Sequence, residues 1–287
     1  MSAVIDTHIH PALFAPICAD RERFAFRCEE MNYHLMSPVD LPLLKKQLGL
    51  AEIRSVFLLG EDCSFEKRES AISNEELAQL VALEPGLFIG FASVDPRRED
   101  AAEELRRAFA DLGLAGLTLN TAKCRLYPWD QRIFRLCEIC REYGKPVVLH
   151  SGFCLEKDAF SRYARPADFE ELIAAFPEIN FCLTHVGWPW VQETAALLIK
   201  YPNAYANTAL MNFDGPVQLY HKVFKEDMGE YWVEHNLADK LMFGSDSPRI
   251  RPVRAKRGLE ALGLRPDVME KICWRNALRF LGREEKL

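Results

Sequence analysis

The sequence predicts an α/β protein, specifically a closed (β/α)8 barrel, and three observations carry this prediction. Short runs of β-branched and aromatic residues alternate with longer amphipathic stretches, which is the pattern of repeated βα units around a parallel sheet. Eight such runs can be counted, and the length of 287 residues is close to that typical of the barrel. We therefore expect one domain over residues 1–287, with a doubly wound open sheet as the alternative.

The predicted strands are short apolar runs bounded by turn residues or by amphipathic segments. They are residues 3–8, 54–60, 87–94, 115–120, 145–151, 179–185, 203–209 and 240–246. Each run is followed by a segment long enough for a helix that returns the chain to the start of the next strand.

The intervals between the strands carry helix-start signals, namely side chains that cap a first turn and prolines that suit it. In chain order these signals are Ser37-Pro38 with Asp40, Ser73 with Glu76 in a capping-box pattern, Asp95-Pro96 and Arg165-Pro166. Further helices are expected over 129–143, 189–201, 216–235 and 254–282, the last divided near the segment GLRPD.

One connection differs from the others. Residues 11–37 follow the first strand without a clear period, and long irregular connections tend to be functional or disordered. The segment includes Arg21, Arg23, Arg27 and His34. We expect this long loop to fold over the mouth of the barrel.

Composition favours a small-molecule partner. The 36 basic and 42 acidic residues give a net charge of −6 without a basic block, so neither nucleic acid nor an anionic membrane is expected as a partner. No apolar run approaches the roughly 20 residues that span a bilayer.

The nine cysteines form no regular framework and the start lacks a signal-peptide pattern, which predicts a reduced, cytoplasmic protein. Cys137 and Cys140 form a CxxC inside an amphipathic helix, where packing is the expected role.

Polar residues stand at the ends of several predicted strands. His8 and His10 flank the end of the first strand, and His150, His185 and Asp246 end the fifth, sixth and eighth. Active sites of this barrel are built at that rim.

The spacing of the first two histidines suggests a metal site. Alternate side chains of a strand share a face, so His8 and His10 both face the barrel axis while Ile9 faces away. With His150 and Asp246 they would form a nitrogen-rich site suited to a divalent ion. A histidine at a strand end is more often a hydrogen-bonded core residue, but four of the seven histidines stand at such ends, and this conjunction favours the metal site.

Several motifs along the chain resemble a known family. They are DTHIH, GKPVVLHSG, LTHVGWPW, LMFGSDSP and RNALRFLG. They resemble the amidohydrolase superfamily, specifically the amidohydrolase-related family that includes aminocarboxymuconate-semialdehyde decarboxylase and γ-resorcylate decarboxylase. The resemblance implies a metal-dependent barrel enzyme in which His8, His10, His150 and Asp246 hold the cation, and His185 lies near the metal-bound water or the substrate. It also implies a homodimer.

The fourth strand departs from the binuclear members of the superfamily, which carry a carboxylated lysine or a glutamate there. In this chain Thr118 and Asn120 occupy the end of that strand, and Lys123 lies too far along to replace the bridge. We therefore expect one divalent ion, zinc in the first place and manganese as the alternative.

The leading functional hypothesis is hydrolysis of a C–O or C–N bond, such as that of a lactone, in a small carboxylated substrate. Asp246 would be the general base and His185 an orienting or electrophilic partner. The alternative is a metal-dependent, non-oxidative decarboxylase acting on an aromatic or muconate-type acid. A TatD-like nuclease is disfavoured by the missing glutamate of strand four, and a barrel without catalysis is disfavoured by the complete set of rim residues.

Candidate substrate contacts come from the loops. Arg249 and one arginine of the first loop, for which we take Arg27, are expected to bind an anionic group. Trp188 and Phe153 could form an apolar wall, although aromatic rings there could instead pack against the barrel. Asn120 is expected to hydrogen-bond the substrate.

Overall fold

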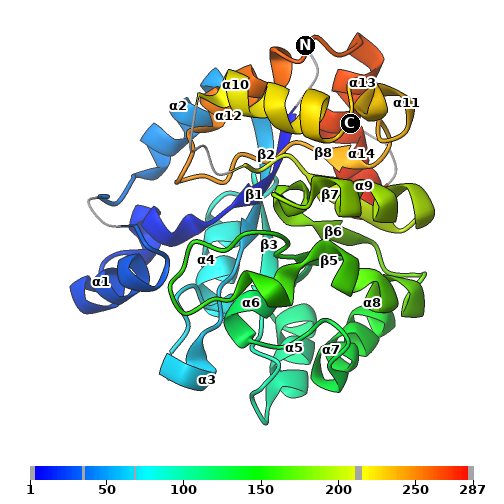
Figure 1. Ribbon diagram of the computed structural model, residues 1–287. Helices are drawn as coiled ribbons and strands as arrows, with labels where there is room; N and C mark the ends of the chain where they lie inside the picture. The colour runs from blue at the N-terminus through cyan, green and yellow to red at the C-terminus, as the bar shows by residue number, and fades with distance from the viewer. Residues whose placement is uncertain (1–3, 34–35, 68, 211–214, 284–287) are drawn as a thin grey trace.

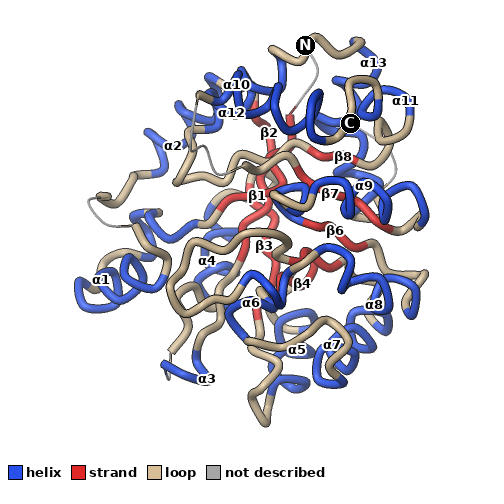
Figure 2. Tube along the Cα trace, viewed as in Figure 1, coloured by secondary structure: helices blue, strands red, loops and turns tan. Residues whose placement is uncertain are grey.

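The computed structural model describes residues 4–33, 36–67, 69–210 and 215–283. Eight parallel strands lie in the order β1 to β8, and helices surround them (Figures 1 and 2). The strands are β1 (Val4–Ile9), β2 (Ile53–Leu59), β3 (Phe88–Ser93), β4 (Gly116–Leu119), β5 (Val147–Leu149), β6 (Phe181–Leu183), β7 (Ala204–Asn207) and β8 (Leu241–Met242). The predicted (β/α)8 barrel is confirmed, with all eight strands at their predicted places.

The helices follow the strands as expected for the barrel. They are α1 (Arg21–Glu30), α2 (Leu41–Leu50), α3 (Ser64–Lys67), α4 (Asn74–Leu83), α5 (Ala101–Ala110), α6 (Thr121–Cys124), α7 (Gln131–Glu142), α8 (Glu170–Ala175), α9 (Val191–Lys200), α10 (Pro216–His221), α11 (Trp232–His235), α12 (Pro252–Glu260), α13 (Pro266–Glu270) and α14 (Asn276–Phe280). Pro266, in the segment GLRPD, begins α13, so the predicted division of the last helical stretch is confirmed.

The first and last strands close the barrel through backbone hydrogen bonds beyond the end of β8. The N–H of Thr7 donates to the carbonyl of Phe243 at 2.9 Å, and the N–H of His10 donates to that of Ser247 at 2.9 Å. Between them, the N–H of Asp246 donates to the carbonyl of His8 at 3.1 Å. The closure therefore brings Asp246 beside β1.

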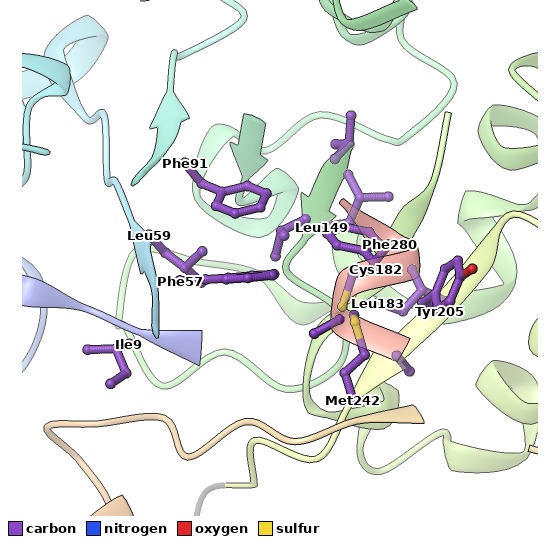
Figure 3. Close-up of a cluster of buried hydrophobic side chains, with 14 of the residues drawn as sticks. Ile9, Phe57, Leu59, Phe91, Leu149, Cys182, Leu183, Tyr205, Met242 and Phe280 are labelled. Atoms are coloured by element: carbon purple, nitrogen blue, oxygen red, sulfur yellow. The ribbon is translucent and has the colours of Figure 1, made fainter. Parts of the chain in front are cut away.

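Aromatic and aliphatic side chains fill the barrel (Figure 3). Phe57 of β2 stacks on Phe91 of β3 with ring centroids 4.8 Å apart, and Phe280 of α14 lies 6.2 and 6.3 Å from these two rings. Phe280 also meets Tyr205 of β7 edge to face. Because α14 inserts this ring among three strands, the interior is a packed core that supports the rim where the polar side chains stand.

The helix starts agree with the capping signals in three of four cases. Asp40 caps α2, the Ser73–Glu76 capping box opens α4, and a 3-10 turn begins at Pro166 before α8. The signal at Asp95-Pro96 is wrong: α5 begins at Ala101. The Asp95 carboxylate instead accepts the N–H and the guanidinium of Arg97, which makes a turn rather than a helix cap.

The long loop after β1 was expected to be irregular, and the structure corrects this. It contains α1, whose first turn is capped by the Asp20 carboxylate accepting from the N–H groups of Glu22 and Arg23. A mostly polar helix leaves little periodic apolar signal, which explains why it was missed. The loop does reach the barrel mouth, where Met31 lines a cavity; His34 lies outside the described residues.

All nine cysteines are free, and Cys137 and Cys140 are buried in α7, in agreement with a packing role. Among the described residues, no helix is long and apolar enough to cross a membrane.

Candidate metal centre

Five polar side chains predicted at the strand ends line one cavity at the barrel rim. His8 and His10 come from β1 and its end, His150 and His185 follow β5 and β6, and Asp246 follows β8. The alternation of β1 is responsible for the first pair, because Ile9 between them is fully buried in the apolar core. The structure therefore brings together the residues that the sequence nominated as ligands.

The closest donor group consists of His8, His10 and Asp246, with one ligand atom from each within 4.8 Å of the others. Nε2 of His8 lies 3.2 Å from Nε2 of His10 and 3.6 Å from Oδ1 of Asp246. His150 is not part of this closest group; its ring centroid lies 5.0 Å from that of His185, whose ring centroid is 4.8 Å from that of His8.

Buried atoms without partners indicate what the centre accepts. Among the described residues, Nε2 of His150, Nδ1 of His10 and Oδ2 of Asp246 have no hydrogen-bond partner. Leaving buried polar atoms unsatisfied costs about 1–3 kcal/mol each, so such atoms call for a ligand or an ion. Three imidazoles and one carboxylate form the donor set that zinc and similar divalent ions accept. The residues therefore fit a single divalent ion.

Burial keeps the imidazoles in the form that binds metals. It lowers the pKa of His10 to about 3 and that of His150 to about 4, and it holds the pKa values of His8 and His185 well below the ordinary range. All four rings are thus neutral at pH 7. Burial raises the pKa of the Asp246 carboxyl to about 7 in the absence of a cation.

Two residues that the sequence analysis missed orient the histidines. Asn207 lies at the end of β7. Its Oδ1 accepts the backbone N–H of His185 at 3.0 Å, and its amide nitrogen lies 3.3 Å from Nδ1 of His8. Asp6 of β1 accepts the N–H groups of His8 at 3.1 Å and Ser245 at 2.9 Å. Asn207 stands at a strand end, so the rule that found the histidines would also have found it.

His185 has a fixed orientation. Its Nδ1 lies 2.6 Å from the carbonyl oxygen of Ala209, which can only accept, so Nδ1 carries the proton. In the neutral ring Nε2 is then a hydrogen-bond acceptor. His185 adopts a left-handed backbone conformation with φ of 58°, as does Asp246 with φ of 63°.

Arg249 lines the cavity, and its role in binding a substrate anion stays a prediction. Its Nη2 donates to Oε1 of Glu156 at 2.8 Å, and its Nε lies 3.8 Å from Oδ2 of Asp246. The guanidinium also stacks 4.7 Å above the ring of Tyr33, which comes from the long first loop. An arginine in this position connects the carboxylate of the metal centre with the outer wall of the cavity.

Three further charged residues were not nominated as site residues. Glu61 follows β2 and lines the cavity, Glu156 comes from the loop after β5, and Lys123 of α6 pairs with Glu61 at 3.4 Å between Nζ and Oε1. Glu61 stands at a strand end and could have been predicted. No spacing signal marks Lys123 or Glu156, because their positions depend on helix and loop geometry.

The predicted substrate contacts have mixed outcomes. Asn120 lines the cavity, and its Oδ1 caps α6 by accepting the N–H of Lys123 at 3.2 Å. Trp188 and Phe153 meet edge to face at 6.2 Å but are not among the residues that line the cavity, and their role as a substrate wall stays a prediction.

The expectation for Arg27 is corrected. Its fully buried guanidinium donates to the carbonyls of Ala71 at 2.6 Å and Ile17 at 2.9 Å and to Glu76 at 2.6 Å. These partners hold the first loop against the segment before α4. Arg27 is therefore a structural residue, and sequence position alone could not distinguish it from a solvent-facing arginine.

Comparison with known proteins gives a consistent result. The family model described as Amidohydrolase matches residues 5–283. The 2-amino-3-carboxymuconate-6-semialdehyde decarboxylase of Dictyostelium discoideum is 27% identical over 243 residues, or 73% of this chain and 65% of that protein. The chain thus spans just under two thirds of the length of this curated relative.

Solved structures show the same barrel. A dihydroxybenzoic acid decarboxylase of Polaromonas sp. JS666, with bound manganese and the inhibitor 2-nitroresorcinol, has a TM-score of 0.64 and 18% identity, covering 99% of this chain and 98% of that chain. A probable 2-pyrone-4,6-dicarboxylic acid hydrolase of Acinetobacter baumannii, with citric acid bound, has a TM-score of 0.66 and 16% identity, covering 97% of this chain and 99% of that chain. At these identities the likeness establishes the fold alone.

Proposed function

The chain belongs to the amidohydrolase family, and from this premise we propose that it is a metal-dependent hydrolase that cleaves a C–O or C–N bond in a small carboxylated substrate such as a lactone. His8, His10, His150 and Asp246 would hold the ion. A divalent ion there supplies Lewis acidity, which polarises a carbonyl group and brings the pKa of water toward neutrality.

The observation that carries the proposal is the environment of the two oxygens of Asp246. Oδ1 faces the imidazole donors, 3.6 Å from Nε2 of His8. Oδ2 is buried without a hydrogen-bond partner among the described residues, and the Nε of Arg249 lies 3.8 Å from it. One oxygen can therefore contact a cation while the other accepts a proton.

In the proposed hydrolysis, Asp246 takes a proton from the attacking water and returns it to the leaving oxygen or nitrogen. The C–O or C–N bond breaks, and an acid and an alcohol or amine are formed. Since the proton of His185 is held by Ala209, Nε2 of His185 accepts a hydrogen bond and orients the water. This favours the orienting role of His185 over the electrophilic one.

Decarboxylation is the second candidate, and the sequence relative favours it, because that protein is a decarboxylase. The same residues would serve. The C–C bond to the carboxylate breaks, carbon dioxide leaves, and Asp246 in its protonated form gives a proton to the carbon.

Product analysis in H₂¹⁸O decides between the two. The protein is loaded with zinc or manganese and offered a panel of carboxylated lactones and hydroxylated aromatic acids. Hydrolysis places ¹⁸O in a ring-opened acid without release of carbon dioxide, whereas decarboxylation releases carbon dioxide without opening a bond to oxygen or nitrogen. Carbon dioxide release with no ¹⁸O-labelled acid would overturn the hydrolase in favour of the lyase.

A further inference from the structure

A protein carboxylate occupies the anion-binding side of the cavity. Glu156 lies in the loop between β5 and the 3-10 turn Ser161–Ala164, and its side chain is only 15% exposed. Its Oε1 accepts from Nη2 of Arg249 at 2.8 Å, and its Oε2 accepts from the thiol of Cys154 at 3.0 Å. Arg249, which is expected to bind a carboxylate of the substrate, is therefore already paired with a carboxylate of the protein.

A second cation, Lys123, lines the neighbouring pocket together with Glu156. Burial opposes ionisation of Glu156, but Lys123 and Arg249 together lower its pKa to about 2. Nζ of Lys123 is buried, makes no hydrogen bond among the described residues and has its ion pair with Glu61 at 3.4 Å. The ammonium group thus keeps donor capacity for a further oxygen, because it carries three N–H groups.

Glu156 also separates two spaces. The cavity at the metal donors measures about 40 Å³, which holds a few water molecules but no aromatic acid. A neighbouring pocket of about 220 Å³ is lined by Lys123, Cys63 and Cys124, and Glu156 lines both spaces. Withdrawal of Glu156 would join the two spaces and give a larger substrate room beside the candidate metal ligands.

The loop is fixed at its root and exposed at its tip. The N–H groups of Gly152 and Phe153 donate at 2.7 Å to the carbonyls of Ala164 and Trp188. Gly152 has φ of 96°, and a Cβ there would come within 2.3 Å of the Trp188 carbonyl oxygen, so the root must remain as it is. Beyond Glu156, Lys157 and Asp158 are exposed. Movement of the tip, once the Asp158 carbonyl is released from Arg125, would withdraw Glu156 while the root hydrogen bonds of Gly152 and Phe153 stay in place.

We propose that Glu156 is a placeholder for a substrate carboxylate, which displaces it from Arg249, approaches Lys123 and joins the two spaces that Glu156 lines. The inference rests on the proposed function in one respect, that the substrate is carboxylated. A carboxylate that replaces Glu156 preserves the charge balance around Arg249 and Lys123. A neutral ligand would leave these two cations with one negative charge fewer nearby. Glu156 therefore selects for a substrate with a carboxylate remote from the bond that reacts.

Calorimetric titration of the metal-loaded protein tests this inference. The probes are benzoate and benzene-1,3-dicarboxylate, with the neutral benzene-1,3-dicarboxamide as the matched control ligand. Glu156→Gln is expected to bind the dicarboxylate about tenfold more tightly than the wild type, because an apparent Kd rises as the fraction of binding-competent molecules falls. Lys123→Gln is expected to weaken it about tenfold, and Glu142→Gln, at an exposed ion pair with Arg106, serves as the matched control variant.

Equal affinities of the wild type and Glu156→Gln for the dicarboxylate, or no binding to either, would overturn the inference. Tighter binding of the diamide by the same factor would also overturn it, since this would indicate steric relief alone. If Glu156→Gln fails to fold by circular dichroism, Glu156→Asp, which shortens the carboxylate, is expected to give a smaller gain in affinity. If the protein turns over a substrate but the wild type and Glu156→Gln bind the dicarboxylate equally, only this inference is contradicted. If Glu156→Gln binds the dicarboxylate more tightly but no substrate is turned over, only the proposed function is contradicted.

Discussion

Glu156 allows a quantitative prediction about acid stability. Its pKa in the folded protein is about 2, compared with an ordinary value of 4.5, and its carboxylate is largely buried. A pKa that folding lowers stabilises the folded state above the ordinary value and loses this effect as the pH falls toward the folded value. At 1.36 kcal/mol per pH unit, the difference between 4.5 and 2 corresponds to about 3 kcal/mol at pH 6 and to about half of that at pH 3.

Urea unfolding of the metal-free wild type and Glu156→Gln between pH 6 and pH 3 measures this effect. The difference in free energy of unfolding between the two proteins is expected to shrink by about 1.5–2 kcal/mol over this range. Glu142→Gln is the control, because Glu142 lies at the surface in an ion pair with Arg106. A difference between wild type and Glu156→Gln that stays constant from pH 6 to pH 3 would show that Arg249 and Lys123 do not hold Glu156 ionised.

Four further outcomes are expected. His10→Ala should lower the bound metal, measured by atomic emission, from one ion per chain to nearly none with the circular dichroism unchanged; full metal content would remove His10 from the ligands. Asp246→Asn should lower kcat by about 10²–10⁴-fold, and normal turnover would exclude it as the base. Arg27→Met should lower the free energy of unfolding by about 2–5 kcal/mol, since it leaves the carbonyls of Ala71 and Ile17 without their donor, and a neutral result would contradict its structural role. The double variant of Cys137 and Cys140 to Ala should retain the full metal content, because both thiols pack inside α7.

The fold and the grouping of the candidate metal ligands could be predicted from the sequence, because the alternation of side chains along a strand and the parallel order of the strands fix where these side chains lie. Alternation in β1 determined which face His8 and His10 share, and parallel strands bring their carboxyl ends to one rim. Asp246 and His150 were found by the same rule. Asn207 and Glu61 also stand at strand ends, so the same rule could have identified them.

The remaining features depend on contacts that no local pattern encodes. The loop after β5 carries Glu156 inward through a turn without periodicity, and Lys123 of α6, more than 30 residues earlier, lines the same pocket. Arg27 and Arg249 are both loop arginines in the sequence, yet one is enclosed by carbonyl groups and the other faces the cavity. Only the tertiary structure distinguishes an arginine that hydrogen-bonds to buried backbone, such as Arg27, from one that lines a cavity, such as Arg249.

The backbone hydrogen bonds that join β1 to the segment after β8 have a consequence for folding during synthesis. His8 leaves the ribosome long before Asp246, and the two are joined when the backbone N–H of Asp246 donates to the carbonyl of His8. A nascent chain without its last strand lacks the carboxylate of the centre. A chain that ends before this segment would lack one of the four predicted ligands, so its affinity for a divalent ion should be lower than that of the complete barrel.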